Sequence, residues 1–224
     1  DFQKKYGKIL LPLITPYDEN EEIDYGKYTE LIEYVITNDL CDSLIVTGTT
    51  GEASLLTFDE RVKLFETAVK ASAGRKPVIA GTGCASTKET IALTNKAYDL
   101  GIELALIVCP FYNKPTQEGL YQHFKTICSE VSMPVILYNV PGRTGCSISE
   151  GVVKRLAGHP NVMGIKEASG NMSYACKIAR YLGPDFAMYS GNDPADMDKF
   201  VEEAVRRRQR GHFRIGQHPA QADP

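Results

Sequence analysis

The sequence lacks the features that mark several large classes of protein. No apolar run approaches the roughly 20 residues that a membrane-spanning helix needs, and residues 1–6 lack the apolar core of a signal peptide. There is no His-Glu-x-x-His motif and no Cys-x-x-Cys pair, because the six cysteines occur singly, at positions 41, 84, 109, 128, 146 and 176. We therefore predict free thiols in a reducing cytosol, with no membrane span, no disulfide framework and no metal site.

Nucleotide-binding signatures are also missing. There is no phosphate-binding P-loop, and Gly81-Thr-Gly83 alone is a weak match to a dinucleotide-binding turn. No Pro/Gly-rich linker or low-complexity segment divides the 224 residues, of which 43% are hydrophobic and 24% are charged. This composition predicts a single globular domain with a sizeable core.

Short apolar segments alternate with amphipathic helical segments along the chain. The segments that predict strands are Lys8–Ile14, Asp42–Thr47, Pro77–Gly81, Leu104–Cys109, Val135–Asn139, Val162–Lys166 and Phe186–Ser190. Helical patterns cover about residues 24–38, 58–73, 87–100, 117–131, 149–158, 172–182 and 194–208, and Thr57-Phe-Asp-Glu60 has the form of a capping box. Strands this apolar are buried on both faces, which indicates a parallel α/β sheet. Seven such units predict a TIM (β/α)8 barrel without its eighth βα unit and C-terminal helical region, and a doubly wound open sheet is the alternative.

Lys166 closes one of these apolar strands. An ammonium group there is costly unless it is paired, solvated or deprotonated. A deprotonated lysine is an amine nucleophile that forms a Schiff base with a carbonyl substrate. The alternative is a structural lysine that reaches solvent or pairs with Glu167.

Polar residues follow the ends of five predicted strands, where a barrel carries its chemistry. They lie in Gly48-Thr-Thr-Gly-Glu52, Cys109-Pro-Phe-Tyr112, Tyr138-Asn-Val-Pro-Gly-Arg143, Lys166-Glu167 and Ser190-Gly191. Each has a plain alternative: a hydroxyl-rich turn for the threonines, solvated rim positions for the tyrosines and a surface ion pair for the arginine. Their occurrence at successive strand ends favours one shared site.

These segments resemble the dihydrodipicolinate synthase family, a group of pyruvate-dependent class I aldolases that includes N-acetylneuraminate lyase. The resemblance runs from Lys8 to about Glu203. It is carried by Gly48–Glu52, Pro77–Gly83, Pro110–Pro115, Tyr121–Phe124, Leu137–Pro141, Arg143–Gly145, Gly164–Glu167 and Ser190-Gly191, in the family's order and spacing.

The resemblance implies a Schiff-base condensation of pyruvate with L-aspartate 4-semialdehyde to 4-hydroxy-tetrahydrodipicolinate, in lysine and diaminopimelate biosynthesis. Lys166 would form the imine. Tyr138 would shuttle protons through a relay with Thr49 and with Tyr112, which in the family comes from a neighbouring subunit. The family therefore implies a homo-oligomer, a tetramer built as a dimer of dimers, without a cofactor.

Substrate binding is implied for four further positions. Thr50 and Gly51 would hold the carboxylate of pyruvate, Arg143 that of the semialdehyde, and Gly191 would line the site. Arg143 favours the synthase over a lyase acting on N-acetylneuraminate or a keto-deoxy sugar acid, which stays the alternative enzyme.

The family's feedback site for lysine is matched less well. Glu89 fits, but Phe58, Arg61 and Ala85 stand where lysine-sensitive members tend to carry His, His and Asn, and Phe111 replaces a common Tyr. We predict weak or absent inhibition by lysine.

The resemblance stops at the C-terminal end of the given sequence. Residues 206–224 carry five Arg and one Asp, a charge of +4 against −7 for residues 1–205. Back-translation of residues 211–219, read one base later, permits the Val-Ile-Ser-Val of the family's eighth strand. We therefore expect an incomplete barrel domain over residues 1–205 and a disordered, frameshift-derived tail over 206–224. Two alternatives are not enzymes. One is an inactive truncated fragment, and the other is a protein that binds nucleic acid through its basic tail.

Overall fold

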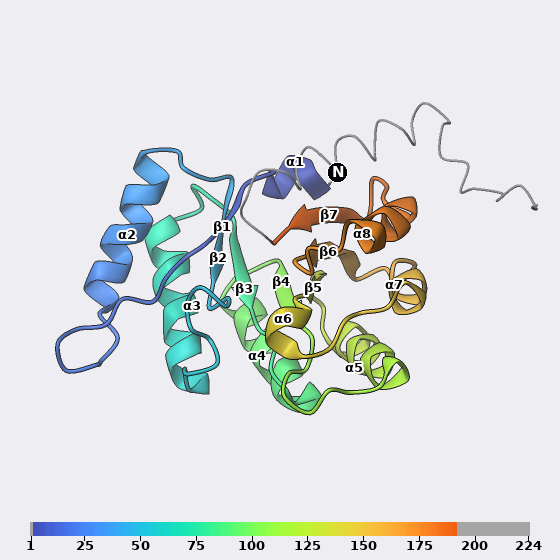
Figure 1. The fold of residues 1–224 in the computed structure, drawn as a ribbon. Helices are drawn as coiled ribbons and strands as arrows, with labels where there is room; N and C mark the ends of the chain where they lie inside the picture. The colour runs from blue at the N-terminus through green and yellow to red at the C-terminus, as the bar shows by residue number, and fades with distance from the viewer. Residues whose placement is uncertain (1, 192–224) are drawn as a thin grey trace, which may run out of the picture.

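Seven parallel strands form one curved sheet in the computed structural model, which describes residues 2–191 (Figure 1). Each strand pairs in parallel with the next one along the chain, in the order β1 to β7. The strands are β1 (Leu10–Pro12), β2 (Ser43–Val46), β3 (Val78–Gly81), β4 (Ala105–Val108), β5 (Val135–Asn139), β6 (Val162–Glu167) and β7 (Ala187–Ser190). All seven predicted strands are therefore confirmed, with bounds that differ by at most two residues at either end.

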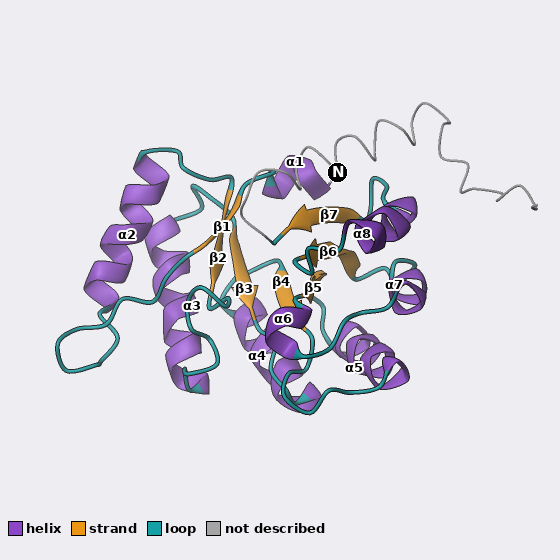
Figure 2. Ribbon diagram, viewed as in Figure 1, coloured by secondary structure: helices purple, strands orange, loops and turns teal. Residues whose placement is uncertain are grey.

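Helices connect the strands and cover the outer face of the sheet (Figure 2). They are α2 (Tyr25–Thr37), α3 (Phe58–Ser72), α4 (Thr87–Asp99), α5 (Gln117–Glu130), α7 (Glu150–Leu156) and α8 (Met172–Ile178), which continues as the 3-10 turn Ala179–Tyr181. Two short helices were not predicted, namely α1 (Phe2–Tyr6) before the first strand and α6 (Pro141–Thr144) directly after β5.

Side-chain caps fix where the connecting helices begin. Thr57 accepts a hydrogen bond from the backbone of Glu60, and the Glu60 carboxylate accepts one from the Thr57 backbone at 2.7 Å, which confirms the predicted capping box. The side chains of Asp24, Ser86 and Thr116 each accept one backbone hydrogen bond at the start of α2, α4 and α5. These caps satisfy N–H groups that a helix cannot satisfy internally, so each helix begins at a defined distance from the strand before it.

Two separate apolar cores result from the alternation of side chains along the strands. The larger core lies between the sheet and the helices, and Leu44, Ile107 and Leu137 contribute to it from β2, β4 and β5. The smaller core lies on the inner face of the curved sheet, where Ile45, Leu106 and Ile136 point. The inner face is therefore a packed apolar interior, and residues at the ends of the strands line a cavity beside it.

The N-terminal segment closes the inner core beside β7. The hydroxyl of Tyr189 donates a hydrogen bond to the carbonyl of Gly7 at 2.9 Å, and the rings of Phe2 and Tyr189 lie 6.4 Å apart. Figure 1 shows α1 next to β7. The first and last described strands are thus linked through side chains of α1 and the residues that follow it.

The consecutive strand order confirms the barrel-type fold, because a doubly wound sheet reverses its order at a switch point. The predicted helix at 194–208, the missing eighth unit and the tail at 206–224 lie outside the described residues. Within residues 2–191, no helix combines the length and apolarity that crossing a membrane requires.

Candidate active site

Tyr138 and Lys166 face each other on neighbouring strands. They are register partners at the carboxyl ends of β5 and β6, and the Lys166 ammonium nitrogen lies 4.7 Å from the centroid of the Tyr138 ring. Both side chains point to the inner face of the sheet, where they line a cavity of about 260 Å³. The sheet geometry thus brings an amine and a phenol together in one small cavity.

Burial and two neighbours have opposing effects on the pKa of the Tyr138 hydroxyl. Burial raises the pKa of Tyr138 above its ordinary value, whereas a hydrogen bond with Thr49 and the positive charge of Arg143 both lower it. The burial effect is the largest, so the phenol stays protonated near neutral pH. A protonated phenol can donate a proton to a reacting group, and Thr49 is placed to exchange protons with it.

Six of the eight predicted site residues line the small cavity. Leu10, Pro12, Ile45 and Leu106 form its apolar wall, and the six predicted residues are Thr49, Thr50, Tyr138, Arg143, Lys166 and Gly191. These six come from the ends of β2, β5, β6 and β7 and from α6. The two predicted residues that do not line the cavity are Gly51 and Tyr112.

A tight turn after β2 presents Thr49 and Thr50 to the cavity. Thr47 has a φ of 52°, which is unusual for a β-branched residue, and its hydroxyl donates a 2.7 Å hydrogen bond to the carbonyl of Gly81. Gly81 permits this contact because a Cβ there would lie 2.4 Å from the Thr47 carbonyl oxygen. The strain at Thr47 turns the chain back over the strand ends.

Gly51 supports that turn rather than forming part of the cavity wall. It is buried, its carbonyl accepts a 2.7 Å hydrogen bond from the Thr15 hydroxyl, and its N–H donates to Gly48. A Cβ at this position would lie 2.9 Å from the carbonyl oxygen of Leu13. A hydrogen-bonded turn therefore carries Thr49 into the cavity, and the roles of Thr49, Thr50 and Gly51 stay predictions.

Gly191 lies directly against Lys166. A Cβ at Gly191 would approach Cε of Lys166 to 2.9 Å and Cβ of Ala168 to 2.7 Å. The Gly191 N–H donates a 2.7 Å hydrogen bond to the carbonyl of Glu167, which fixes this approach. The absence of a side chain here leaves room for the lysine chain.

Tyr112 points away from the cavity of its own chain. It follows β4, has a φ of 71°, and 90% of its surface is exposed. An exposed aromatic ring on a loop in the left-handed region is costly for a single chain to maintain. Its role in the site stays a prediction.

A buried polar pair, which the sequence did not predict, supports the Tyr138–Lys166 pair. Asn139 and Glu167 are the next register partners on β5 and β6, both are fully buried, and the Asn139 amide donates to the Glu167 carboxylate at 2.7 Å. The Ser169 N–H donates to the other oxygen of Glu167 at 2.6 Å, and the amide oxygen of Asn139 accepts from the Ile148 N–H at 2.9 Å. These donors hold the Glu167 carboxylate on the face of β6 away from Lys166. Adjacent polar residues at two strand ends were the available signal.

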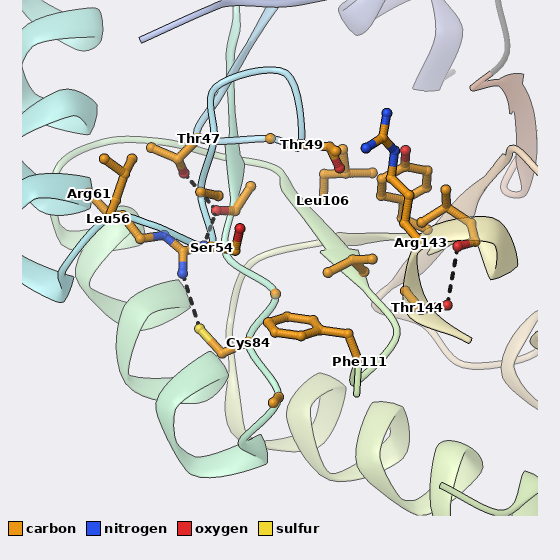
Figure 3. A pocket seen from close by; sticks show the side chains of 18 of the residues that line it. Thr47, Thr49, Ser54, Leu56, Arg61, Cys84, Leu106, Phe111, Arg143 and Thr144 are labelled. Atoms are coloured by element: carbon orange, nitrogen blue, oxygen red, sulfur yellow. Dashed lines mark hydrogen bonds between the residues drawn. The ribbon is translucent and has the colours of Figure 1, made fainter. Parts of the chain in front are cut away.

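A second, larger cavity of about 480 Å³ adjoins the first through Thr49, Tyr138 and Arg143. Figure 3 shows Thr49 and Arg143 on one side of it, with Cys84 and Phe111 on the other. Four of the five residues of the feedback comparison line it, namely Arg61, Ala85, Glu89 and Phe111; Phe58 does not.

Arg61 lines the larger cavity, and its side chain makes two hydrogen bonds. Its guanidinium is buried and donates to the Gly81 carbonyl at 2.6 Å and to Cys84 Sγ at 3.1 Å. This differs from the imidazole expected in lysine-sensitive members, and weak lysine inhibition stays a prediction.

Across residues 2–191, no group of three or more His, Cys, Asp or Glu side chains is arranged to hold a metal ion. The six cysteines are free thiols. Four of them are buried, and Cys146 and Cys176 are partly exposed.

Comparison with known proteins identifies the family. The profile of the dihydrodipicolinate synthetase family matches residues 5–203. The chain belongs to this family. It is 49% identical over 189 residues to the 4-hydroxy-tetrahydrodipicolinate synthase of Bacillus subtilis (strain 168), a match that covers 84% of this chain. The same match covers 65% of the relative, so the chain spans slightly less than two thirds of that enzyme.

Solved structures of the family share the fold of this chain. Dihydrodipicolinate synthase from Cyanidioschyzon merolae, solved with lysine bound, superposes with a TM-score of 0.84 at 39% identity, over 89% of this chain and 67% of its own. The chloride-inhibited enzyme of Acinetobacter baumannii, solved with pyruvate, gives 0.79 at 42% identity, over 82% of this chain and 63% of its own. The seven described strands therefore correspond to a dihydrodipicolinate synthase barrel.

Proposed function

We propose that this chain carries the reaction centre of a 4-hydroxy-tetrahydrodipicolinate synthase, with Lys166 as the nucleophile. The observation that carries the proposal is the facing pair of Lys166 and Tyr138 in one small cavity, with Thr49 bonded to the phenol. The pyruvate complex of the Acinetobacter baumannii relative supports pyruvate as the first substrate.

The first half of the reaction builds a nucleophile from pyruvate. The Lys166 amine attacks the ketone carbon and forms a carbinolamine, and Tyr138 donates the proton with which the hydroxyl leaves as water. The resulting protonated imine withdraws electrons, so a methyl proton passes to the Tyr138 phenolate and an enamine forms. Thr49 exchanges protons with the Tyr138 hydroxyl and resets it for the next transfer.

The second half joins the enamine to the aldehyde carbon of aspartate semialdehyde. Arg143 lines both cavities and is exposed, so its guanidinium is available to a carboxylate that enters from the larger one. The amine of the semialdehyde then attacks the imine carbon, the ring closes, and Lys166 leaves as a free amine. Thr50 and the backbone of the 48–51 turn hold the carboxylate of pyruvate in this scheme.

The small cavity favours a short keto acid over a sugar acid. Its volume of about 260 Å³ lies below the range of roughly 300–1,000 Å³ that is usual for drug-sized ligands. A sugar acid would have to extend past Arg143 into the larger cavity. A pyruvate-dependent lyase acting on such an acid is the second candidate, favoured only by that adjoining space.

We also propose that the active form is a homo-oligomer in which Tyr112 enters the site of a neighbouring subunit. Its 90% exposure in the single chain and its position after β4 support this assignment. A cytosolic location and the absence of a cofactor belong to the same proposal.

Borohydride trapping tests the proposal on the full chain. Pyruvate with borohydride should attach covalently to Lys166, as read by peptide mass spectrometry, and Lys166→Arg should abolish the adduct. Lys154→Arg, which replaces an exposed lysine of α7, is the matched control and should leave the adduct unchanged.

Substrate choice is then read from turnover. Consumption of pyruvate together with aspartate semialdehyde supports the synthase. Cleavage of N-acetylneuraminate, with no consumption of aspartate semialdehyde, supports the lyase. Absence of any adduct in a folded chain would exclude both.

The division of the chain at residues 205 and 206 stays a proposal, because that boundary lies outside the described residues. Sequencing the gene across codons 195–215 tests it. Restoration of Gly-Val-Ile-Ser-Val by a one-base correction would support the frameshift, and an unchanged sequence would refute a reading error.

A further inference from the structure

Cys109 and Cys146 lie side by side behind the candidate active site. Cys109 follows β4 and is fully buried, whereas Cys146 follows α6 and is partly exposed. The two thiols lie close enough for each to shift the pKa of the other. No sequence pattern indicates this pair, because the two cysteines come from different βα loops.

The surrounding backbone holds both sulfurs at this contact. Cys146 Sγ lies 3.3 Å from the carbonyl oxygen of Pro110, the residue after Cys109, and Cys109 Sγ lies 3.5 Å from the carbonyl oxygen of Tyr138. The Thr144 hydroxyl donates to the carbonyl of Cys146 at 2.8 Å and so fixes the local turn. The approach therefore depends on contacts from three segments rather than on one flexible loop.

The two thiols differ in the way that a reactive thiol and its partner usually differ. The interaction with the Cys109 side chain lowers the pKa of Cys146 to about 6, against a smaller opposing effect of burial. The same contact, together with burial, raises the pKa of Cys109 far above its ordinary value. When Cys146 ionises it can no longer donate to the Pro110 carbonyl, which leaves its sulfur free to turn toward Cys109.

We propose that Cys146 is a peroxide-reactive thiol and that Cys109 resolves its oxidised form to a Cys109–Cys146 disulfide. This site is independent of the proposed function, because neither thiol takes part in the imine chemistry.

The chemistry needs one equivalent of a peroxide. The Cys146 thiolate attacks one oxygen of hydrogen peroxide, the O–O bond breaks, and hydroxide leaves and takes up a proton to become water. The product is a sulfenic acid on Cys146. The Cys109 sulfur then attacks the sulfenic sulfur, an S–S bond forms, and the S–OH group leaves as a second water with the Cys109 proton. The two thiols lose two electrons, which reduce the peroxide.

The disulfide would tie together two segments that carry site residues. A bond of about 2 Å between the sulfurs draws the residues after β4 toward the turn after α6. The first segment carries Phe111 and Tyr112, and the second follows α6, the helix that contains Arg143. The Cys109 N–H still donates to the Tyr138 carbonyl at 3.3 Å, so the β4–β5 pairing can survive the change.

Peptide mapping of the full chain under non-reducing conditions tests the proposal. After treatment with a small excess of hydrogen peroxide, the linked peptide containing Cys109 and Cys146 should appear, lighter by two hydrogens than the separate peptides. Dimedone should label Cys109→Ser at position 146, because the sulfenic acid then lacks its resolving thiol. The matched control Cys176→Ser, at a partly exposed cysteine of α8, should still form the linked peptide.

The pH dependence of alkylation separates a tuned thiol from a merely exposed one. Iodoacetamide modification of Cys146 should reach half of its plateau rate near pH 6. In Cys109→Ala, which removes the neighbouring thiol, the midpoint should rise by at least one unit. Rate at a single pH is a poor readout, because lower basicity also lowers the nucleophilicity of a thiolate.

Three results would overturn the proposal. One is a folded native chain that forms no linked peptide with peroxide, and another is a Cys146 midpoint that Cys109→Ala does not move. The third is oxidation of Cys146 only to sulfinic acid, with Cys109 left reduced.

Discussion

The same strands form both faces of the curved sheet, but one face packs the core and the other lines the candidate active site. On the outer face, Leu137 of β5 and Ile165 of β6 are fully buried in an apolar layer against the helices. On the inner face, their chain neighbours Tyr138 and Lys166 line a cavity. Successive side chains of a strand point to opposite faces of the sheet. Neighbouring residues on one strand can therefore serve either the stability of the core or the chemistry of the cavity.

Buried polar groups at the strand ends also differ from those among the helices, although both lie on the outer side of the sheet. The buried polar groups at the ends of β5 and β6 are matched, since the Asn139 amide and the Glu167 carboxylate bond each other and nearby backbone N–H groups. In the outer layer, His123 on α5 keeps one ring nitrogen, Nε2, buried without a hydrogen-bond partner. The strand ends are thus preorganised for polar chemistry, whereas the helix layer tolerates polarity at a cost in stability.

The largest effects are expected from substituting one residue on each face of β6. Lys166→Ala should abolish the borohydride adduct while the free energy of unfolding changes little, because Lys166 lines a cavity and is only partly buried. Ile165→Ala should leave the adduct detectable but lower the free energy of unfolding by roughly 2–5 kcal/mol. Urea denaturation and peptide mass spectrometry measure the two properties. Equal losses of stability in both variants would contradict the assignment of stability to the outer face and chemistry to the inner face.

Removing one hydroxyl from the inner face should slow the chemistry without removing the nucleophile. Tyr138→Phe should reduce exchange of the pyruvate methyl protons with deuterated water by roughly 10²–10⁴-fold, the usual contribution of a proton-transfer group. Tyr189→Phe is the matched control, since its hydroxyl bonds only the Gly7 carbonyl among the contacts described. A comparable loss of exchange in both variants would assign Tyr138 a packing role.

His123 should make the outer layer sensitive to acid. Burial lowers the pKa of His123 to about 4, against about 6.5 in the unfolded chain, and Thr87 bonds Nδ1 at 2.8 Å. The unfolded chain therefore takes up the proton first as the pH falls below about 6.5. Stability that is present above that pH is lost progressively toward pH 4, by about 3 kcal/mol in all.

The variant His123→Asn should remove this share of the pH dependence, as measured by urea denaturation between pH 7 and pH 4. His159→Asn replaces a partly exposed histidine and should keep the slope of the parent chain. An unchanged slope in His123→Asn would mean that the acid sensitivity arises elsewhere.

The smallest effect is expected from crowding the lysine. Gly191→Ala places a Cβ within 2.9 Å of Lys166 Cε, so the side chain must shift, and we expect imine formation to slow by roughly ten- to a hundredfold. Gly183→Ala is the control, because nothing lies within 4 Å of the added Cβ. Single-turnover trapping measures both rates. An unchanged rate of imine formation in Gly191→Ala would show that the Lys166 side chain can accommodate the added Cβ.

Hydrophobic pattern was enough to predict the strands and most helices. Val135–Asn139 agrees with β5 at both ends, and Thr57 with Glu60 marks the start of α3. The two missed helices, α1 and α6, have five and four residues, too few to show a helical period. Local signals therefore determined the long elements, and the short ones depended on contacts that form only on folding.

The sequence by itself determined which residues stand at the strand ends, and so placed Thr49, Tyr138, Arg143 and Lys166 near one another. Only the tertiary structure decided which of them touch. Register between β5 and β6 sets Tyr138 against Lys166, Asn139 against Glu167, and strand order brings Cys109 to Cys146. Side-chain direction along one strand follows from its own period of two, whereas contact between strands depends on pairing and on loops distant in the chain.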